Sequence, residues 1–209
     1  MTDKKRNDRV LGIAFGAVLL LAAFGVAMAL TGSGGPAEAT ELAPVTITGD
    51  ALVEFPAPGQ ADPGAGSAAP QVTGVGFDGA AVDLLSADSS TIVVFLAHWC
   101  PHCRREVPVL VDELGGNLPD GVRLVGVATA TRDTEANYPP SAWLDSEDWP
   151  FEVLVDSKDY EAAAAYGVNS FPAFAVVGPD GTLLARGSGE LSAAELAALV
   201  ATAADAVDG

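Results

Sequence analysis

The sequence predicts an α/β fold in which helices cover both faces of a mixed central β-sheet. Apolar runs typical of strands alternate with segments of helical periodicity over the second two-thirds of the chain. The predicted order is a β-hairpin followed by β, α, β, α, β, α, β, β and α. The last two strands flank a Gly-Pro-Asp-Gly turn at 178–181, which indicates a second hairpin.

The amino-terminal segment predicts a membrane anchor. Residues 1–9 carry four basic and two acidic side chains, and the 21 residues Val10–Leu30 carry no charge. Because a bilayer core of ~30 Å needs about 20 helical residues, we expect residues 10–30 to form a transmembrane signal-anchor. The preceding basic residues indicate a cytoplasmic amino terminus, with the rest of the chain outside the cytoplasm. Ala27-Met28-Ala29 also resembles a cleavage site, so removal of the segment stays open.

Residues 31–70 are predicted to be a flexible acidic linker. They contain 7 Gly, 6 Pro and 5 acidic residues but no basic residue. A weak apolar alternation between residues 44 and 55 allows one short strand there. The folded domain is then expected to span residues 71–209, which is long enough for one hydrophobic core.

The first half of that domain contains the opening hairpin and the central strand. Val75–Phe77 and Ala81–Leu84 flank Asp78-Gly79, a pattern typical of a hairpin. The continuous apolar run Thr91–Leu96 predicts a strand that is buried on both faces. The helix that follows should end at Gly115-Gly116.

The second half continues the alternation of strands and helices. Its expected elements are a strand at 122–128, a short helix at 141–147, a strand at 151–155, a helix at 160–166, strands at 174–177 and 182–185, and a last helix opened by the capping box at 192–195.

The residues with redox chemistry lie between the central strand and the next helix. Cys100 and Cys103 are the only cysteines, and Pro101 and His102 separate them. At a helix start, free N–H groups and the helix dipole favour an anion. The Cys100 thiol should therefore ionise more readily than a free cysteine, and the thiolate is the species that attacks disulfides. Cys103 could close a redox-active disulfide with it.

Other interpretations of this motif are less favoured. A purely structural disulfide is less expected, because so small a ring is usually redox-labile. Both histidines, His98 and His102, lie at the same junction as the cysteines. Four ligands so close in the chain cannot surround one zinc ion, so no metal site is expected. Copper or zinc binding by the two thiolates alone stays open.

The charge and the number of cysteines limit the kinds of partner and the cellular compartment that suit this chain. Beyond residue 9 the chain has 6 basic and 26 acidic residues. A surface this acidic argues against nucleic-acid binding. Two cysteines in one motif of an exported chain suit an oxidising compartment.

Several independent motifs together resemble the thioredoxin superfamily. The segments that carry the resemblance are Trp99-Cys100-Pro101-His102-Cys103, Pro108 in the following helix, and Gly167–Phe174 around Pro172. The opening hairpin, the insertion around Trp143 and the segment 151–156 look like the membrane-anchored branch of TlpA/ResA-like thiol-disulfide oxidoreductases. The likeness covers residues 71–209.

The resemblance implies a thioredoxin-like fold with an added amino-terminal hairpin, and it implies roles for four residues. Cys100 would be the nucleophile and Cys103 the resolving thiol. His102 would stabilise the Cys100 thiolate, and Pro172 would occupy the cis-proline position against the sulfurs.

The resemblance also implies a substrate groove and partners. Trp99, Pro101 and Phe171 would line the groove, where a client chain pairs with the Phe171 backbone as an added strand. The expected substrates are thiols and disulfides of exported proteins, together with a membrane redox partner. No organic cofactor or metal is needed for such exchange.

Two departures from the family pattern leave the direction of exchange open. Thioredoxins carry a buried aspartate that assists the inner cysteine where this chain has Val94, which favours an oxidising or isomerising protein unless Glu152 or another carboxylate substitutes for it. The Pro-His dipeptide resembles that of the periplasmic Dsb-type oxidant, whereas the domain pattern resembles reductases for cytochrome c maturation.

A non-enzymatic copper or metal chaperone is the alternative from another functional class. A peroxiredoxin-type peroxidase is not expected, because the Pro-x-x-x-Thr/Ser-x-x-Cys loop is absent before Cys100.

Overall fold

The structure, a computed structural model, describes residues 39–55 and 60–208. Its main sheet has five strands in the order β6-β5-β4-β7-β8. β4 pairs in parallel with β5 and antiparallel with β7, so the sheet is mixed, as predicted. The strands are β4 (Ser90–Leu96), β5 (Val122–Ala128), β6 (Glu152–Val155), β7 (Ala173–Val177) and β8 (Leu183–Ser188).

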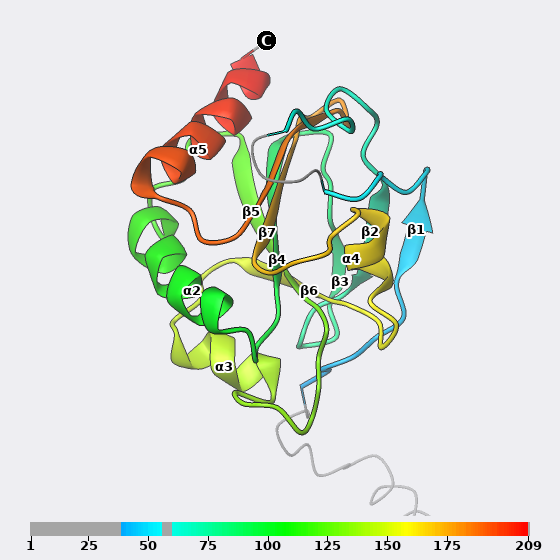
Figure 1. The fold of residues 1–209 in the computed structure, drawn as a ribbon, viewed down its shortest axis with the longest axis vertical. Helices are drawn as coiled ribbons and strands as arrows, with labels where there is room; N and C mark the ends of the chain where they lie inside the picture. Colours follow the sequence, from blue (N-terminus) through cyan, green and yellow to red (C-terminus); the bar gives the residue numbers. More distant parts are fainter. Residues whose placement is uncertain (1–38, 56–59, 209) are drawn as a thin grey trace, which may run out of the picture. The chain divides into compact units, whose positions relative to one another are not determined.

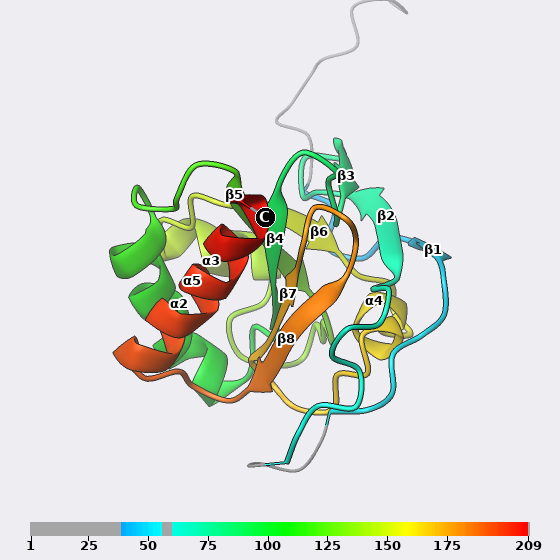
Figure 2. The ribbon, with the colours of Figure 1, turned by 90° about the horizontal axis from the view of Figure 1, so that it is seen from above.

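Helices lie on both faces of this sheet, which confirms the predicted fold class (Figures 1 and 2). They are α2 (Pro101–Leu114), α3 (Pro140–Ser146), α4 (Glu161–Ala165) and α5 (Ala193–Asp208). α2, α3 and α5 lie on one side of the sheet, and α4 lies on the other (Figure 2). Every predicted helix and strand of the main sheet is present, with bounds that differ by a few residues.

The central strand β4 explains why its sequence is a continuous apolar run. All seven of its residues are buried. Because successive side chains point to opposite faces of a sheet, Val94 packs with the helices α2 and α5 whereas Phe95 packs with α4. A strand with both faces covered has no position left for a solvent-facing polar residue.

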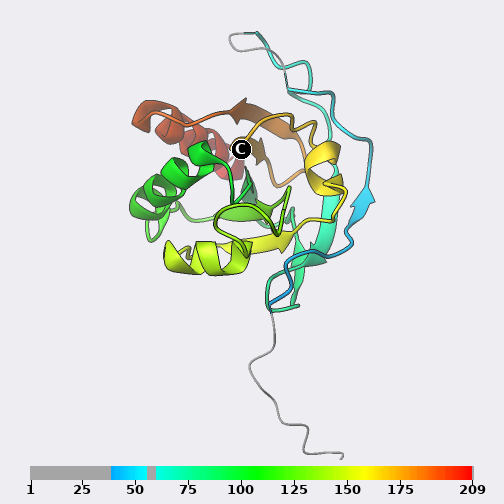
Figure 3. The ribbon, with the colours of Figure 1, turned by 60° about the horizontal axis from the view of Figure 1, so that its bottom comes forward.

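The predicted amino-terminal hairpin is present but belongs to a separate sheet. β1 (Thr46–Thr48), β2 (Gln71–Val75) and β3 (Ala81–Asp83) form a three-stranded antiparallel sheet. The first hairpin strand therefore precedes the predicted Val75–Phe77. Figure 3 shows this small sheet beside α4, on the side of the main sheet opposite α2.

The predicted linker at 31–70 needs correction over residues 39–55 and 60–70, because these segments pack on the domain. Leu52 and Phe55 are only 9% and 8% exposed and join the core under α4. Asp62 pairs with Arg186 at 2.6 Å (Oδ1 to Nη2), and the Arg186 side chain is fully buried. The folded unit thus begins well before residue 71. Glycine and proline content reflects local chain flexibility, but it carries no information about partners distant in sequence.

The predicted cytoplasmic segment 1–9 and anchor 10–30 lie outside the described residues. Over residues 39–55 and 60–208, no helix combines the length and the apolar character needed to cross a membrane.

Candidate active site

Cys100 lies at the amino end of α2, where the sequence places it. Its N–H donates to the Ala97 carbonyl oxygen at 2.9 Å, and it is the N-cap residue, with extended dihedral angles of φ −72° and ψ 121°. Pro101 follows in the first turn, where a missing N–H costs no helical hydrogen bond. The remaining N–H groups of this turn and the helix dipole favour a negative charge at this position.

The two sulfurs differ in access. Both cysteines are free thiols in this structure. Cys100 is 6% exposed, whereas Cys103, inside α2, is 0% exposed. Burial raises the pKa of the Cys103 thiol, so this thiol stays protonated at neutral pH. Both cysteines are thus buried, and Cys100 is the one that retains some exposure, which suits it for the first step of stepwise disulfide exchange.

Sheet topology brings a distant loop to Cys100. Because β4 and β7 are antiparallel, the end of β4 lies beside the start of β7, with Phe95 opposite Ala173. The residues that follow β4 therefore meet the residues that precede β7. The Phe171–Pro172 peptide bond is cis, and the Cys100 thiol donates to the Phe171 carbonyl oxygen at 3.5 Å. The structure thus brings together two motifs that lie far apart in the sequence.

The predicted groove residues share one surface around Cys100. Pro101 is exposed, and Trp99 and Phe171 are partly exposed. The rings of Trp99 and Phe171 meet edge to face with centroids 6.3 Å apart. The Trp99 Nε1–H donates to the Ala130 carbonyl oxygen at 2.8 Å, and the guanidinium of Arg132 lies 4.6 Å from the ring centroid. Trp99 is thereby held as one wall of the surface beside the sulfur.

His102 is engaged by two charged neighbours at the exposed start of α2. The described residues show no hydrogen bond between His102 and Cys100. The exposed imidazole instead lies 2.6 Å from Glu190 (Nδ1 to Oε1) and 2.9 Å from Arg105 (Nδ1 to Nη2). The stabilisation of the Cys100 thiolate by His102 therefore stays a prediction, and in this structure any such effect acts without a hydrogen bond between the two side chains.

A buried carboxylate, Glu106, was missed by the sequence analysis. It lies on α2 one turn after Cys103 and is 2% exposed. Its Oε2 accepts the Leu191 N–H at 3.1 Å, and its Oε1 has no partner. Burial raises the pKa of this carboxyl. The sequence contains a signal for it, because Glu106 falls on the stripe of buried positions that also holds Cys103 and Leu110.

The carboxylate suggested from the sequence, Glu152, does not take this position. Its side chain is 46% exposed and pairs with Arg123 at 2.5 Å (Oε2 to Nη2). Val94, which replaces the buried aspartate of thioredoxins, is fully buried against the helices. Among the residues that the structure describes, Glu106 is thus the buried acid of the active-site helix.

The second histidine, His98, is buried and hydrogen-bonded to the backbone of the loop at residues 132–136. His98 is 1% exposed, and its Nδ1 lies 2.7 Å from the Ala136 carbonyl oxygen. Its Nε2 accepts the Arg132 N–H at 3.1 Å. A carbonyl needs a donor and an N–H needs an acceptor, so the ring is the neutral tautomer with hydrogen on Nδ1. His98 therefore fixes the loop that supports Trp99.

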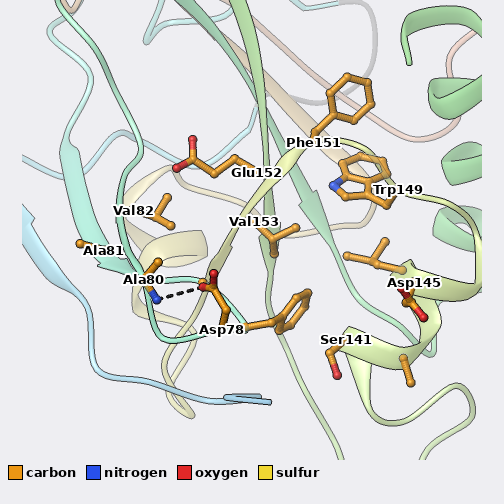
Figure 4. Close-up of a pocket in the computed structure, with 14 residues that line it drawn as sticks. Asp78, Ala80, Ala81, Val82, Ser141, Asp145, Trp149, Phe151, Glu152 and Val153 are labelled. Carbon is orange, nitrogen blue, oxygen red and sulfur yellow. Dashed lines mark hydrogen bonds between the residues drawn. The ribbon is translucent and has the colours of Figure 1, made fainter. Parts of the chain in front are cut away.

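A pocket of about 590 Å³ lies away from the cysteines, between the β2–β3 turn and α3 (Figure 4). Trp149, Phe151 and Val153 form part of its apolar wall, and Asp78, Asp145 and Glu152 lie at its edges. None of its lining residues is a cysteine or a histidine. Disulfide exchange takes place on an accessible surface, so this pocket is not the candidate site.

Comparisons with known proteins agree with the site geometry. The AhpC/TSA family profile matches residues 65–186, more than half of the 209 residues. The chain belongs to the AhpC/TSA family. The match includes the cysteine motif, Glu106 and the cis-proline loop. No curated protein matches the chain significantly.

Solved structures similar to this family member include three bacterial proteins. A secreted disulfide oxidoreductase from Mycobacterium tuberculosis, homologous to E. coli DsbE, is 27% identical with a TM-score of 0.51, covering 62% of this chain and 93% of its own. A thiol:disulfide interchange protein from a Bacteroides species is 25% identical with a TM-score of 0.53, covering 69% and 91%. The thioredoxin domain of a Bacteroides vulgatus thiol-disulfide oxidoreductase shares the fold at 24% identity, with a TM-score of 0.54, covering 66% and 95%.

The family, the thioredoxin-like fold and the Cys100–Cys103 pair at the helix start agree with one another. Together they identify the chain as a thioredoxin-like thiol-disulfide oxidoreductase.

Proposed function

We propose that this protein is a membrane-anchored oxidoreductase that exchanges disulfides with exported proteins outside the cytoplasm. The observation that carries the exchange is the position of the Cys100 sulfur, at the start of α2 and 3.5 Å from the Phe171 carbonyl oxygen. The uncharged segment 10–30 supports anchoring. The similar M. tuberculosis protein is secreted, which supports a site of action outside the cytoplasm.

The first step of exchange uses the accessible sulfur. The Cys100 thiolate attacks one sulfur of a client disulfide, so that a Cys100–client bond forms and the client S–S bond breaks. The second client sulfur leaves as a thiolate and takes up a proton from solvent. In the opposite direction, a client thiolate attacks the Cys100–Cys103 disulfide at Cys100.

The second step needs Cys103 to lose its proton. Burial raises the pKa of the Cys103 thiol, so a base must accept that proton before the sulfur attacks. Glu106 is buried one turn away and has an unpartnered oxygen. We assign it this proton-accepting role. The Cys103 thiolate then attacks Cys100, the Cys100–Cys103 disulfide forms, and the reduced client leaves.

The client is proposed to bind as an extended segment. The backbone of Phe171 precedes β7, and Trp99 and Phe171 form an aromatic surface beside Cys100. A client strand paired with this backbone would present its sulfur to Cys100. Pro101 would form the opposite edge of the groove. A membrane redox partner that resets the cysteine pair would use the same surface.

Two alternatives make different predictions. A reductase dedicated to cytochrome c maturation would use the same residues in one direction only, and the reduction potential distinguishes it from an oxidant.

A copper chaperone would bind the metal through the two thiolates. Within residues 39–55 and 60–208, no group of three or more His, Cys, Asp or Glu side chains is arranged to hold a metal ion. Titration of the reduced protein with copper tests that role.

Trapping of clients tests the proposed exchange. In Cys103→Ser, Cys100 can form a mixed disulfide with a client but the second step is blocked, so exported proteins should accumulate as dithiothreitol-sensitive adducts. Cys100→Ser is the matched control and should form none. Equal adduct levels in both variants would contradict the role of Cys100.

Labelling in intact cells tests the proposed location. A membrane-impermeant maleimide should modify Cys100 of the Cys103→Ser variant without permeabilisation. Modification only after the inner membrane is broken would place the domain in the cytoplasm and contradict the proposal.

A further inference from the structure

Three ionisable side chains form a cluster beside the exposed start of α2. This cluster, named the mouth cluster below, consists of His102, Arg105 and Glu190. The Arg105 Nη2 lies 2.6 Å from Glu190 Oε1, and its Nε lies 3.0 Å from Oε2, so the guanidinium binds the carboxylate with two nitrogens. His102 Nδ1 lies 2.6 Å from the same Oε1. The Glu190 carboxylate therefore contacts two basic side chains of the active-site helix, His102 and Arg105.

Glu190 is held in place by backbone contacts on both sides of the active site. The Gly189 N–H donates to the Pro172 carbonyl oxygen at 2.8 Å, which joins this segment to the cis-proline loop. The Leu191 N–H donates to Glu106 Oε2 at 3.1 Å, which joins it to α2. Gly189 has φ +95°, a conformation that other residues adopt at a cost. Glu190 is thus fixed between the two motifs that form the site.

Glu190 stays ionised throughout the physiological pH range. The hydrogen bonds from Arg105 and then His102 lower its pKa to about 2. Neither of the neighbouring acids, Glu106 and Glu195, can take its place as the partner of His102 and Arg105. Glu106 is buried beneath the cluster and its pKa is raised, and Glu195 is engaged by Ser192. Glu190 is therefore the carboxylate that faces both His102 and Arg105.

The mouth cluster lies within electrostatic reach of the reactive sulfur. His102 is two residues from Cys100. Hydrogen bonding to Glu190 raises the pKa of Arg105, and a smaller contribution comes from the Cys100 thiolate. A cation near a cysteine stabilises its thiolate, and a stabilised thiolate makes the disulfide a stronger oxidant. The negative charge of Glu190 opposes that effect.

We infer that Glu190 weakens the oxidising power of the Cys100–Cys103 disulfide by compensating the positive charge of Arg105, whose guanidinium it binds beside His102. Glu190 is a positioning residue, which acts on the sulfur through its two basic neighbours. The inference rests on the proposed exchange function and specifies its direction. The Pro-His dipeptide alone suggests a strong oxidant, and Glu190 shifts the protein toward the reductase side.

Equilibration of the full-length protein with glutathione tests this inference. Two glutathione thiols reduce the protein disulfide to two thiols and yield one glutathione disulfide. In Glu190→Gln, the amide keeps the shape of the side chain but removes its charge. We expect the disulfide of this variant to be reduced about tenfold more readily than the wild type, a shift of about 30 mV toward oxidising values for a two-electron couple.

Matched variants separate the charge effect from a structural one. Glu113→Gln removes the same charge near the other end of α2 and should leave the equilibrium unchanged. In the His102→Asn/Arg105→Gln background, adding Glu190→Gln should shift the equilibrium by less than about twofold. This background lacks the basic side chains whose charge Glu190 compensates. In 1 M salt the tenfold effect should shrink, since the Debye length falls to about 3 Å.

The outcomes are distinguishable. A wild type that equilibrates with glutathione while Glu190→Gln shows the wild-type constant overturns the inference alone. The same shift in Glu113→Gln, or a full shift in the background without His102 and Arg105, also overturns it. A wild type that never exchanges with glutathione or dithiothreitol overturns the proposed function and the inference together. A melting temperature of Glu190→Gln equal to wild type establishes that the variant is folded.

Discussion

At the scale of single residues, the active site combines a slightly exposed cysteine, a fully enclosed cysteine and an enclosed carboxylate. Cys100 was predictable as the nucleophile position because its neighbours in sequence form a strand-to-helix junction. Glu106 was not predicted, because a glutamate in a helix is normally solvated. Helical periodicity places this position on the buried stripe, but only the packing of α2 shows that the carboxylate itself is enclosed, one turn from Cys103.

Glu106→Gln should slow the second step of exchange. The amide cannot accept the proton of the buried Cys103 thiol, so release of the client from the mixed disulfide should fall by about 10²-fold, a loss typical of a missing general base. Stopped-flow measurement of mixed-disulfide decay reports this step. The initial attack by Cys100 should change little, and an unchanged decay rate would exclude the proton-accepting role.

The same substitution should raise stability at neutral pH. Burial raises the folded-state pKa of Glu106. The free energy of unfolding of the wild type therefore falls as pH rises from the unfolded-state pKa of about 4.3 through the folded-state pKa. The amide that replaces it lacks that titration and can still accept the Leu191 N–H. Urea unfolding at pH 7 should show a gain of about 1 kcal/mol that disappears below about pH 4. A gain that is equal at both pH values would contradict this origin.

At the scale of elements, the site depends on where strands and helices end. β4 and β7 run antiparallel, so the end of one and the start of the other place Cys100 against Phe171. The segment between β8 and α5 closes the site from a third side through Glu190. The segment before α5 therefore contributes to the site as well as to the fold.

Removal of the capping box of α5 should lower stability. The Ser192 hydroxyl lies 2.6 Å from Glu195 Oε2, and the Glu195 N–H donates to the Ser192 hydroxyl at 3.3 Å. Ser192→Ala should lower the free energy of unfolding by about 1 kcal/mol. Thermal unfolding measures it, with Ser67→Ala, an exposed serine outside any helix, as the control. A loss no larger than in that control would show that the cap contributes nothing.

At the scale of the whole molecule, the described segments before residue 71 belong to the folded domain. Leu52 and Phe55 are buried under the main sheet, and Asp62 pairs with the buried Arg186. These contacts span more than a hundred residues of sequence. They tie the amino-terminal segments to β8, the edge strand next to the cis-proline strand β7.

A domain that starts at residue 71 should be markedly less stable than one that starts at residue 39. Burial of Leu52 and Phe55 contributes about 1.5–3 kcal/mol each, so the shorter chain should lose about 3 kcal/mol or more of unfolding free energy. Denaturant titration of both fragments measures the difference. Equal midpoints and slopes would mean that the amino-terminal segments add no stability.

The Asp62–Arg186 pair should make stability fall in acid. The hydrogen bond from Arg186 lowers the folded-state pKa of Asp62, so its contribution is complete above the unfolded value of about 4 and is lost as pH falls through the folded value. Asp62→Asn should cost about 2 kcal/mol at pH 7. The difference from wild type should shrink below about pH 4, and a difference that is constant down to about pH 2 would exclude the ion pair as its source.

The sequence by itself determined the order of strands and helices, the α/β class and the cysteine pair at the start of a helix. Periodicity, turn residues and caps are local signals, so they survive without knowledge of the fold. The tertiary structure alone decided that the Glu106 carboxylate is enclosed, that Glu190 lies beside His102 and Arg105, and that residues 39–55 and 60–70 pack on the domain. Each of these depends on contacts between segments far apart in the chain, which local patterns such as the apolar stripe of α2 do not specify.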